Sequence, residues 1–115
     1  MKLFGRTSTK VDPVTAHELA GAGVLLDVRE ADEWKAGHAP EARHIPLGQL
    51  ERRLRELPHD VTIVTACRSG HRSASARRLL AARGWDTRNL AGGMHAWARA
   101  GLPVVDQRGR PGRVV

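Results

Sequence analysis

The residue with the clearest chemical potential is Cys67, the only cysteine among the 115 residues of the chain. It opens a short polar segment, residues 67–73, which reads CRSGHRS and separates an apolar run from an amphipathic one. So short a loop after a strand makes the chain curl back around the sulfur. Gly70 permits the unusual backbone angles that such a curl needs. The pattern therefore points to a cysteine enclosed by its own loop.

The predicted surroundings of Cys67 are electropositive. Inward N–H groups of residues 68–73 form an anion-binding nest, and the following helix directs its positive dipole end toward the sulfur. Arg68 and Arg72 add full positive charges. Such surroundings hold the pKa of a cysteine thiol below its ordinary value of about 8.5, and the thiolate is the nucleophile. The alternative is that Cys67 is an inert core residue at a strand end.

Apolar and helical patterns alternate around this segment. Runs at 24–28 and 61–66 predict buried strands, and 87–90 predicts a weaker third strand. The predicted helices cover about 12–20, 47–57, 73–83 and 94–100. This alternation predicts an α/β fold with a mainly parallel central sheet and helices on both faces. Sites in such sheets form at the carboxyl ends of strands, where Cys67 lies.

Six segments, in order along the chain, resemble those of the single-domain rhodanese family. They are LDVRE at 26–30, EWKAGH at 33–38, HIPL at 44–47, CRSGHRS at 67–73, LAGGMHAW at 90–97 and GLPV at 101–104. The resemblance implies one rhodanese-like domain over residues 9–105. Residues 1–8 and 106–115 are then expected to be loose basic termini.

The resemblance also implies roles for individual residues. Cys67 matches the nucleophile that carries a persulfide. The positions that match the substrate-binding loop are Arg68, Ser69, Gly70, His71, Arg72 and Ser73. Asp27 and Arg29 match supporting positions beside the loop. His38 matches a position near the pocket, where a hydrogen-bonded structural role and a substrate contact are equally consistent with the sequence.

The activity implied by the resemblance is that of a thiosulfate sulfurtransferase. Cys67 would take a sulfane sulfur from thiosulfate or a small persulfide and pass it to cyanide, an external thiol or an acceptor protein. The chain offers no second cysteine to resolve the persulfide, and the reaction requires neither metal nor organic cofactor.

Two alternatives stay open: a Cys-dependent phosphatase or arsenate-handling enzyme on the same fold, and a noncatalytic interaction module. The loop from Cys67 through Arg72 has six residues, one fewer than in the phosphatases of the family, and it supplies no carboxyl group to protonate a leaving alcohol. The loop therefore favours sulfur over phosphate.

The net charge and the aromatic content of the chain limit the kinds of partner that it is expected to bind. The formal charge of +7 favours an anionic partner: a small sulfur donor, an acidic protein or nucleic acid. An aromatic content of 3%, with no tyrosine, argues against stacking on single-stranded nucleic acid. The six histidines show no metal-ligand spacing. The sequence shows neither a secretory signal nor the roughly 20 apolar residues of a membrane span, so we expect a cytoplasmic protein, monomeric or dimeric as in similar family members.

Overall fold

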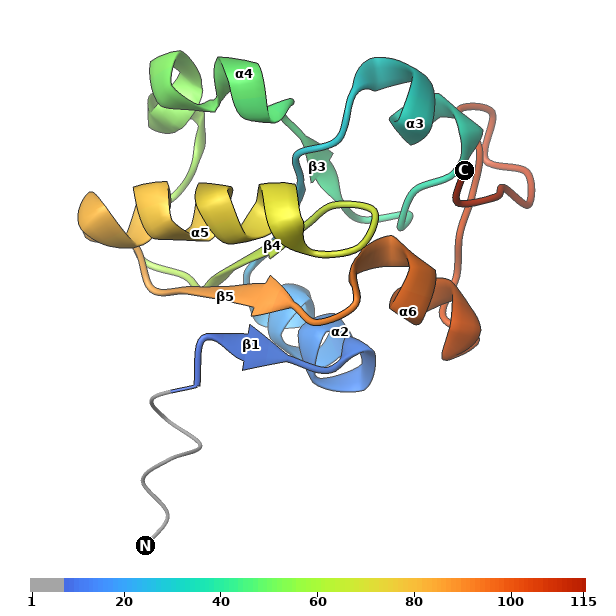
Figure 1. The fold of residues 1–115 in the computed structure, drawn as a ribbon, viewed down its shortest axis with the longest axis horizontal. Helices are drawn as coiled ribbons and strands as arrows, with labels where there is room; N and C mark the ends of the chain where they lie inside the picture. The colour runs from blue at the N-terminus through green and yellow to red at the C-terminus, as the bar shows by residue number, and fades with distance from the viewer. Residues whose placement is uncertain (1–7) are drawn as a thin grey trace, which may run out of the picture.

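The computed structural model describes residues 8–115, and most of the predicted loose N-terminus lies outside this range. Its centre is a five-stranded parallel sheet with the order β1-β5-β4-β2-β3 (Figure 1). The strands are β1 (Lys10–Val11), β2 (Val24–Asp27), β3 (Arg43–His44), β4 (Ile63–Ala66) and β5 (Thr87–Leu90). The predicted parallel sheet is confirmed. The two edge strands were not predicted, because two residues are too few to show a periodic pattern.

Helices cover both faces of this sheet (Figure 1). One face carries α4 (Leu47–Leu50), the 3₁₀ helix η1 (Glu51–Glu56) and α5 (His71–Ala82). The other carries α2 (Pro13–Ala22) and α6 (Gly93–Arg99). A short helix that the sequence did not predict, α3 (Ala31–Ala36), follows β2.

The side chains of β2, and of Val28 directly after it, pack into two cores, one on each face of the sheet. Val24, Leu26 and Val28 enter the core beneath α5, whereas Leu25 enters the core beneath α2 and α6. All four residues of β2 and of β4 are buried. A strand covered on both faces reads as a continuous apolar run, as predicted.

Helix ends agree with the sequence in part. Asp12 caps α2, its carboxylate accepting the Thr15 N–H at 2.9 Å, and Pro13 occupies the first turn. The segment predicted as one helix over 47–57 is instead divided, with Arg53 leaving helical geometry at φ −116°. Helix α5 begins at His71 rather than at Ser73, which brings its amino end closer to Cys67.

The segment 106–115, expected to be loose, is hydrogen-bonded to the rest of the chain. Val105 forms antiparallel bridges with both His38 and Pro111. The Arg113 N–H donates to the Ala36 carbonyl at 2.9 Å, and Val114 packs against the core beneath α2 and α6. These contacts satisfy the backbone groups that a frayed end would leave to water. Within residues 8–115 no helix has the length and apolarity needed to cross a bilayer.

Candidate active site

Cys67 directly follows β4, and the loop after it folds back over the sulfur. The Gly70 N–H donates to Cys67 Sγ at 3.0 Å, and the Ser73 hydroxyl donates to the same sulfur at 3.3 Å. Gly70 has φ +123°, a conformation that side chains rarely adopt, as predicted from the need for a tight curl. The loop therefore presents hydrogen-bond donors to the sulfur atom.

These donors decide the acidity of the thiol. Burial, which leaves Cys67 1% exposed, raises its pKa because a thiolate loses hydration. The hydroxyl of Ser73 and the backbone N–H groups of Ser73, Gly70 and Ser69 lower it and together outweigh burial. The net result is a pKa for Cys67 below the ordinary value, which favours the nucleophilic thiolate.

Side chains from β4 and β5 hold the loop from behind. Asn89 donates its amide to the Gly70 carbonyl at 3.1 Å. The Thr65 hydroxyl donates to the Ser73 carbonyl at 2.9 Å. Both side chains are buried, so their hydrogen bonds do not compete with water. These hydrogen bonds anchor the loop at Gly70 and at Ser73, the two residues that donate to the sulfur.

The amino end of α6 supports the loop from another side. The N–H of Met94 donates to the Cys67 carbonyl at 2.8 Å, and the N–H of His95 donates to the Arg68 carbonyl at 3.1 Å. Gly93 makes this approach possible. A Cβ at this position would lie 2.4 Å from the Arg68 carbonyl oxygen, and the residue has φ +62°. Gly93, the first residue of α6, thus allows the helix to approach the Cys67 loop, whereas a Cβ at Gly92 would meet Ala96 of the same helix.

Asp27 and Arg29 form a fully buried ion pair at the end of β2, with Arg29 NH2 2.7 Å from Asp27 Oδ2. The same guanidinium donates to the Gly37 carbonyl at 2.7 Å. The pair therefore connects β2 to the carboxyl end of α3. In the structure the hydrogen bonds of these two side chains go to each other and to the segment 29–37, and the supporting role expected for them stays a prediction.

Arg72 is held by a carboxylate that the sequence analysis did not single out. Its NH1 and NH2 groups lie 2.7 and 2.9 Å from the two carboxylate oxygens of Glu33 in α3. The Arg72 hydrogen bonds hold the pKa of Glu33 at about 2, although partial burial opposes this effect. The pKa of Arg72 is raised by the same contact, so both partners stay ionised.

The other predicted loop side chains point elsewhere. Arg68, Ser69 and His71 are exposed, and none of these side chains forms a hydrogen bond to Cys67 Sγ in the structure. His38 stacks on Trp34 with ring centroids 3.6 Å apart and donates from Nδ1 to the Trp34 carbonyl. Its backbone pairs with Val105. Of the two roles considered for His38, these contacts fit the structural one.

Sequence reasoning missed four residues that position the loop: Glu33, Thr65, Asn89 and Gly93. Glu33 carried one signal, because Glu30 and Glu33 have the spacing of reciprocal caps and form a capping box at the start of α3. Thr65 carried another, since it is the polar residue in the otherwise apolar strand β4, whereas Asn89 lies in the mostly polar β5 and had no such signal.

A hollow of about 350 Å³ lies on the outer side of the loop. Its charged and polar lining includes Lys10, His71, Arg78 and Asn89, with Ser69 and Gly70 forming the wall shared with the loop. Small anions match this lining. Across residues 8–115, His, Cys, Asp and Glu side chains form no group of three or more that could hold a metal.

Comparisons with known proteins agree with this geometry. The model of the rhodanese-like domain matches residues 12–100. A sulfurtransferase of Allochromatium vinosum is 40% identical over 87 residues, covering 75% of this chain and 81% of that protein. An HTH-type transcriptional regulator of Mycobacterium tuberculosis is 40% identical over 100 residues, but the chain spans only 44% of its length.

A solved structure shows the same fold. The rhodanese-related protein from Thermoplasma volcanium superposes with a TM-score of 0.79 at 30% identity, covering 84% of this chain and 96% of that one. The family match includes β2, Cys67 and its loop, and the start of α6. The chain belongs to the rhodanese-like domain family.

Proposed function

We propose that this protein is a sulfurtransferase that carries sulfane sulfur on Cys67. The main support is the pair of donors on Cys67 Sγ, the Gly70 N–H at 3.0 Å and the Ser73 hydroxyl at 3.3 Å. They favour a thiolate in the free enzyme, and the neighbouring loop N–H groups suit the outer, anionic sulfur of a persulfide. The family membership and the sulfurtransferase relative agree with this chemistry.

The proposed cycle has two displacements. The Cys67 thiolate attacks the outer sulfur of thiosulfate, the S–S bond of thiosulfate breaks, and sulfite leaves with its electron pair. The enzyme then holds a Cys67 persulfide anion. Cyanide or an external thiolate attacks the outer sulfur of that persulfide, and the Cys67 thiolate is released as the leaving group. No proton needs to reach the sulfur in either displacement.

The charges near the loop disfavour phosphate-ester hydrolysis. Protonating a leaving alcohol requires a carboxylic acid that still carries its proton near neutral pH. Glu33 is the carboxylate bound to the loop arginine, and its pKa of about 2 keeps it ionised. Arg72 is also engaged by both Glu33 oxygens, so it is not free to take two oxygens of a phosphoryl group.

The loop also argues against a noncatalytic module. The Gly70 N–H and the Ser73 hydroxyl both reach the Cys67 sulfur, and groups outside the loop hold these donors in place. The outside groups are the side chains of Thr65 and Asn89 and the backbone N–H groups of Met94 and His95. A domain used only for docking has no physical need for a buried cysteine of lowered pKa.

Mass spectrometry tests the proposal. After incubation with thiosulfate, the intact protein should gain the mass of one sulfur atom at Cys67, and later cyanide should remove it as thiocyanate. Cys67→Ser should abolish both events without changing the urea unfolding midpoint by much, because serine is close in size. Hydrolysis of an aryl phosphate that depends on Cys67, without persulfide formation, would support the phosphatase instead.

A further inference from the structure

The tail after Val105 builds a basic surface beyond the residues matched by the family model. A turn holds its shape: the Asp106 carboxylate accepts the N–H groups of Arg108 and Arg110, each at 2.9 Å. These hydrogen bonds lower the pKa of Asp106, so its carboxylate stays ionised. The Gln107 N–H donates to the Lys35 carbonyl at 3.2 Å, which fixes the turn against α3.

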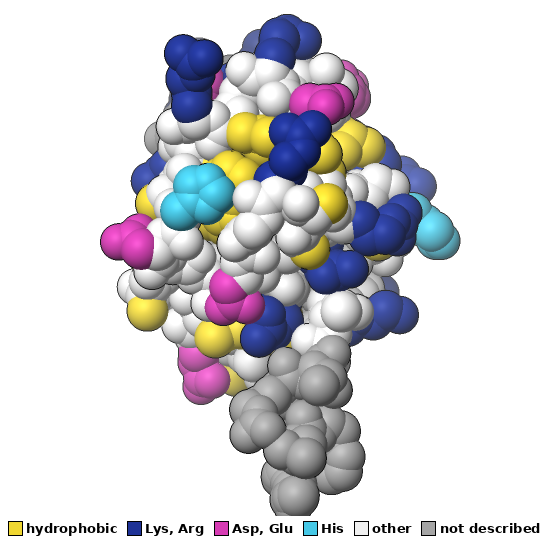
Figure 2. Space-filling view, turned by 90° about the vertical axis from the view of Figure 1, so that its left-hand side faces the viewer, with side chains coloured by type: hydrophobic (Ala, Val, Ile, Leu, Met, Phe, Trp, Pro, Cys, Tyr) yellow, Lys and Arg dark blue, Asp and Glu magenta, His cyan; other side chains and the backbone are white. Residues whose placement is uncertain are grey.

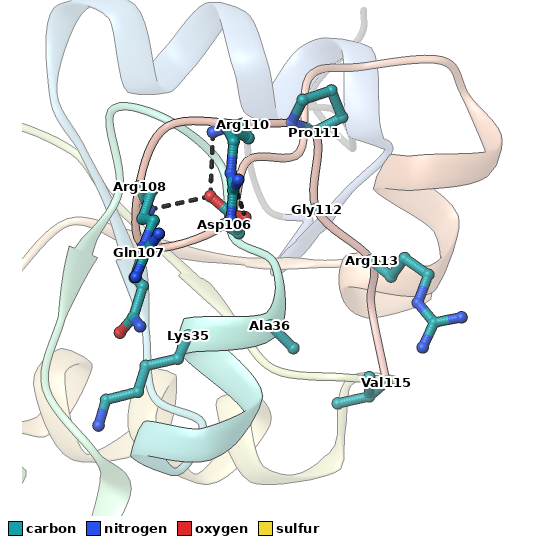
Figure 3. A pocket seen from close by; sticks show the side chains of 10 residues that line it. All are labelled: Lys35, Ala36, Asp106, Gln107, Arg108, Arg110, Pro111, Gly112, Arg113 and Val115. Atoms are coloured by element: carbon teal, nitrogen blue, oxygen red, sulfur yellow. Dashed lines mark hydrogen bonds and ion pairs between the residues drawn. The ribbon is translucent and has the colours of Figure 1, made fainter.

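The side chains on this tail leave a surplus of positive charge. Two hollows of about 450 and 470 Å³ flank the tail. Among the described side chains that line them, one is a carboxylate, Asp106, and the basic ones are Lys35, Arg99, Arg108, Arg110 and Arg113. We call these five basic residues the basic ridge. Figure 3 shows Lys35 and Arg108 on one side of the tail and Arg113 turned to the other.

The other end of the molecule is different. Figure 2, which views the end away from the tail, shows Lys and Arg side chains interspersed with Asp and Glu and with apolar surface. At that end, arginines are paired with carboxylates: Arg53 with Glu56, and Arg83 with Glu51. The basic ridge has one such pair, Arg110 with Asp106 at 3.6 Å.

The basic ridge adjoins the two helices that touch the Cys67 loop. On one side Lys35 belongs to α3, whose Glu33 binds Arg72. On the other side Arg99 belongs to α6, whose first N–H groups bind the Cys67 and Arg68 carbonyls. Figure 1 shows the tail at the end of the molecule toward which β4 and β5 point. A partner seated on the ridge would therefore contact the same two helices that support the loop.

We infer that the basic ridge docks an acidic segment of a partner protein. The partner would be the sulfur acceptor, and its acidic segment would bring a thiol to the Cys67 persulfide. This role of the partner rests on the function proposed above. The ridge has the form expected for electrostatic docking, since its arginines are exposed and its backbone is held by hydrogen bonds. The chain has no second cysteine, so a sulfur held by Cys67 must leave to an external group.

A protein segment fits the ridge better than nucleic acid does. No Trp, Tyr or Phe side chain lines either hollow among the described residues, and the imidazole of His95 is the one ring there, so a row of unpaired bases finds little to stack on. The ridge is also short, being built from one turn and two helix ends rather than from a groove that follows a phosphate backbone.

Binding is tested with a fluorescent peptide rich in Asp and Glu and a matched peptide with Asn and Gln, both cysteine-free. The protein variant is Arg108→Glu with Arg113→Glu, which reverses charge on both sides of the tail. We expect the acidic peptide to bind more tightly than the neutral one, and the double variant to weaken it about tenfold at low salt, since reversed charges repel. Raising ionic strength to about 0.3 M should reduce the difference.

The matched control is Arg52→Glu with Arg55→Glu, which changes the formal charge by the same amount. Both arginines are exposed residues of η1, at the other end of the molecule. The control should change the affinity less than about twofold. Equal weakening in both double variants, or equal binding of both peptides, overturns the inference. A single-stranded or duplex oligonucleotide is the competing ligand. If it binds more tightly than the acidic peptide, and the double variant of Arg108 and Arg113 loses that binding, the inference is overturned in favour of nucleic acid.

Sulfur transfer is measured separately, with the cysteine-containing versions of the same peptides as acceptors. Acidic-peptide binding that depends on the ridge, without any Cys67 persulfide, would leave the docking surface standing while the proposed function fails. Persulfide formation and thiocyanate release, together with equal binding of the acidic and neutral peptides, would overturn the docking surface and leave the proposed function standing.

Discussion

At Cys67, burial and hydrogen bonding act on the thiol in opposite directions, and hydrogen bonding prevails. The sequence predicted inward loop N–H groups, with added charge from Arg68 and Arg72. In the structure the direct donors are loop N–H groups and the Ser73 hydroxyl, whereas the Arg72 guanidinium is bound by Glu33. Fixed short-range donors act on a buried sulfur more strongly than a neutralised cation does.

The first prediction concerns Ser73→Ala. Removing the hydroxyl 3.3 Å from Cys67 Sγ should raise the pKa of Cys67, because burial is then opposed by fewer hydrogen bonds. Alkylation by iodoacetamide requires the thiolate, so its rate profile should move to higher pH. The thiocyanate-forming rate should also fall below the wild-type rate at neutral pH.

Ser75→Ala is the matched control, since Ser75 lies exposed on the same helix and its hydroxyl accepts from Arg78 rather than meeting the sulfur. Its alkylation profile should coincide with that of the wild type. A Ser73→Ala profile that also coincides would show that the hydroxyl does not set the acidity of Cys67.

At the level of elements, α3 connects the buried Asp27–Arg29 pair to the loop. Arg29 binds the carbonyl of Gly37 just after the helix, and Glu33 within the helix binds Arg72. A helix of six residues gains little stability from its own hydrogen bonds. The contacts at both ends therefore fix where α3 lies and, through Arg72, where the loop lies.

We expect Glu33→Gln to destabilise the protein by about 1–2 kcal/mol at neutral pH, less than a fully buried pair because Arg72 is partly exposed. The folded-state pKa of about 2 lies below the usual 4.5, so the ion pair contributes fully above pH 4.5 and is lost as pH falls toward 2. Lowering the pH from 7 to 3 should therefore reduce the free energy of unfolding, measured with urea, more in the wild type than in the variant.

Glutamine keeps an oxygen for the Glu30 N–H, which preserves that part of the helix cap. Asp32→Asn, an exposed neighbour on α3 outside the ion pairs of the structure, should change stability little and leave the acid dependence of the wild type intact. Equal acid dependence of wild type and Glu33→Gln would mean that the pair contributes nothing measurable.

The contact between α6 and the loop gives a third prediction. Gly93→Ala would place a Cβ 2.4 Å from the Arg68 carbonyl oxygen at a positive φ. We expect a loss of about 1–3 kcal/mol, together with slower sulfur transfer, because the Cys67 and Arg68 carbonyls must shift. Urea unfolding and the thiocyanate assay measure the two effects.

Gly48→Ala is the control, because a Cβ at this helical position meets nothing within 4 Å. It should be neutral or stabilising by up to about 1 kcal/mol. If both alanine variants behave alike, close packing of α6 on the loop does not constrain the site.

For the whole molecule, the carboxyl edge of the sheet gathers the features that bear on function. The loop follows β4, α3 follows β2, and α6 follows β5, so the segments after three parallel strands meet at one edge (Figure 1). The tail returns to the same edge through the bridges of Val105 with His38 and Pro111.

The fourth prediction is that deleting residues 107–115 costs about 2 kcal/mol, since backbone hydrogen bonds and the packing of Val114 are lost. Arg108→Ala, which removes an exposed side chain and leaves the backbone turn, should change the free energy of unfolding little. Urea unfolding compares the two variants with the full chain. Identical midpoints for the deletion and the full chain would show that the tail adds no stability.

The sequence alone determined what is local along the chain. Cys67, Gly70 and the other loop residues are contiguous, so their spacing predicted the curl and the helix that follows. The runs that became β2 and β4 were apolar enough to predict buried strands, and their alternation with helical patterns predicted a parallel sheet, whereas the mostly polar β5 gave a weaker signal. Edge strands of two residues and the six-residue α3 were too short to leave a pattern.

Only the tertiary structure decided which distant residues meet. Glu33 and Arg72 are 39 positions apart, and Asn89 lies 19 positions from the Gly70 carbonyl that it holds. Such contacts follow from the strand order, which places β4 between β2 and β5, and no periodic pattern encodes that order. The tail showed the same dependence: its mixture of Gly, Pro and Arg without periodicity predicted a loose end, whereas its backbone hydrogen bonds to α3 hold it in place.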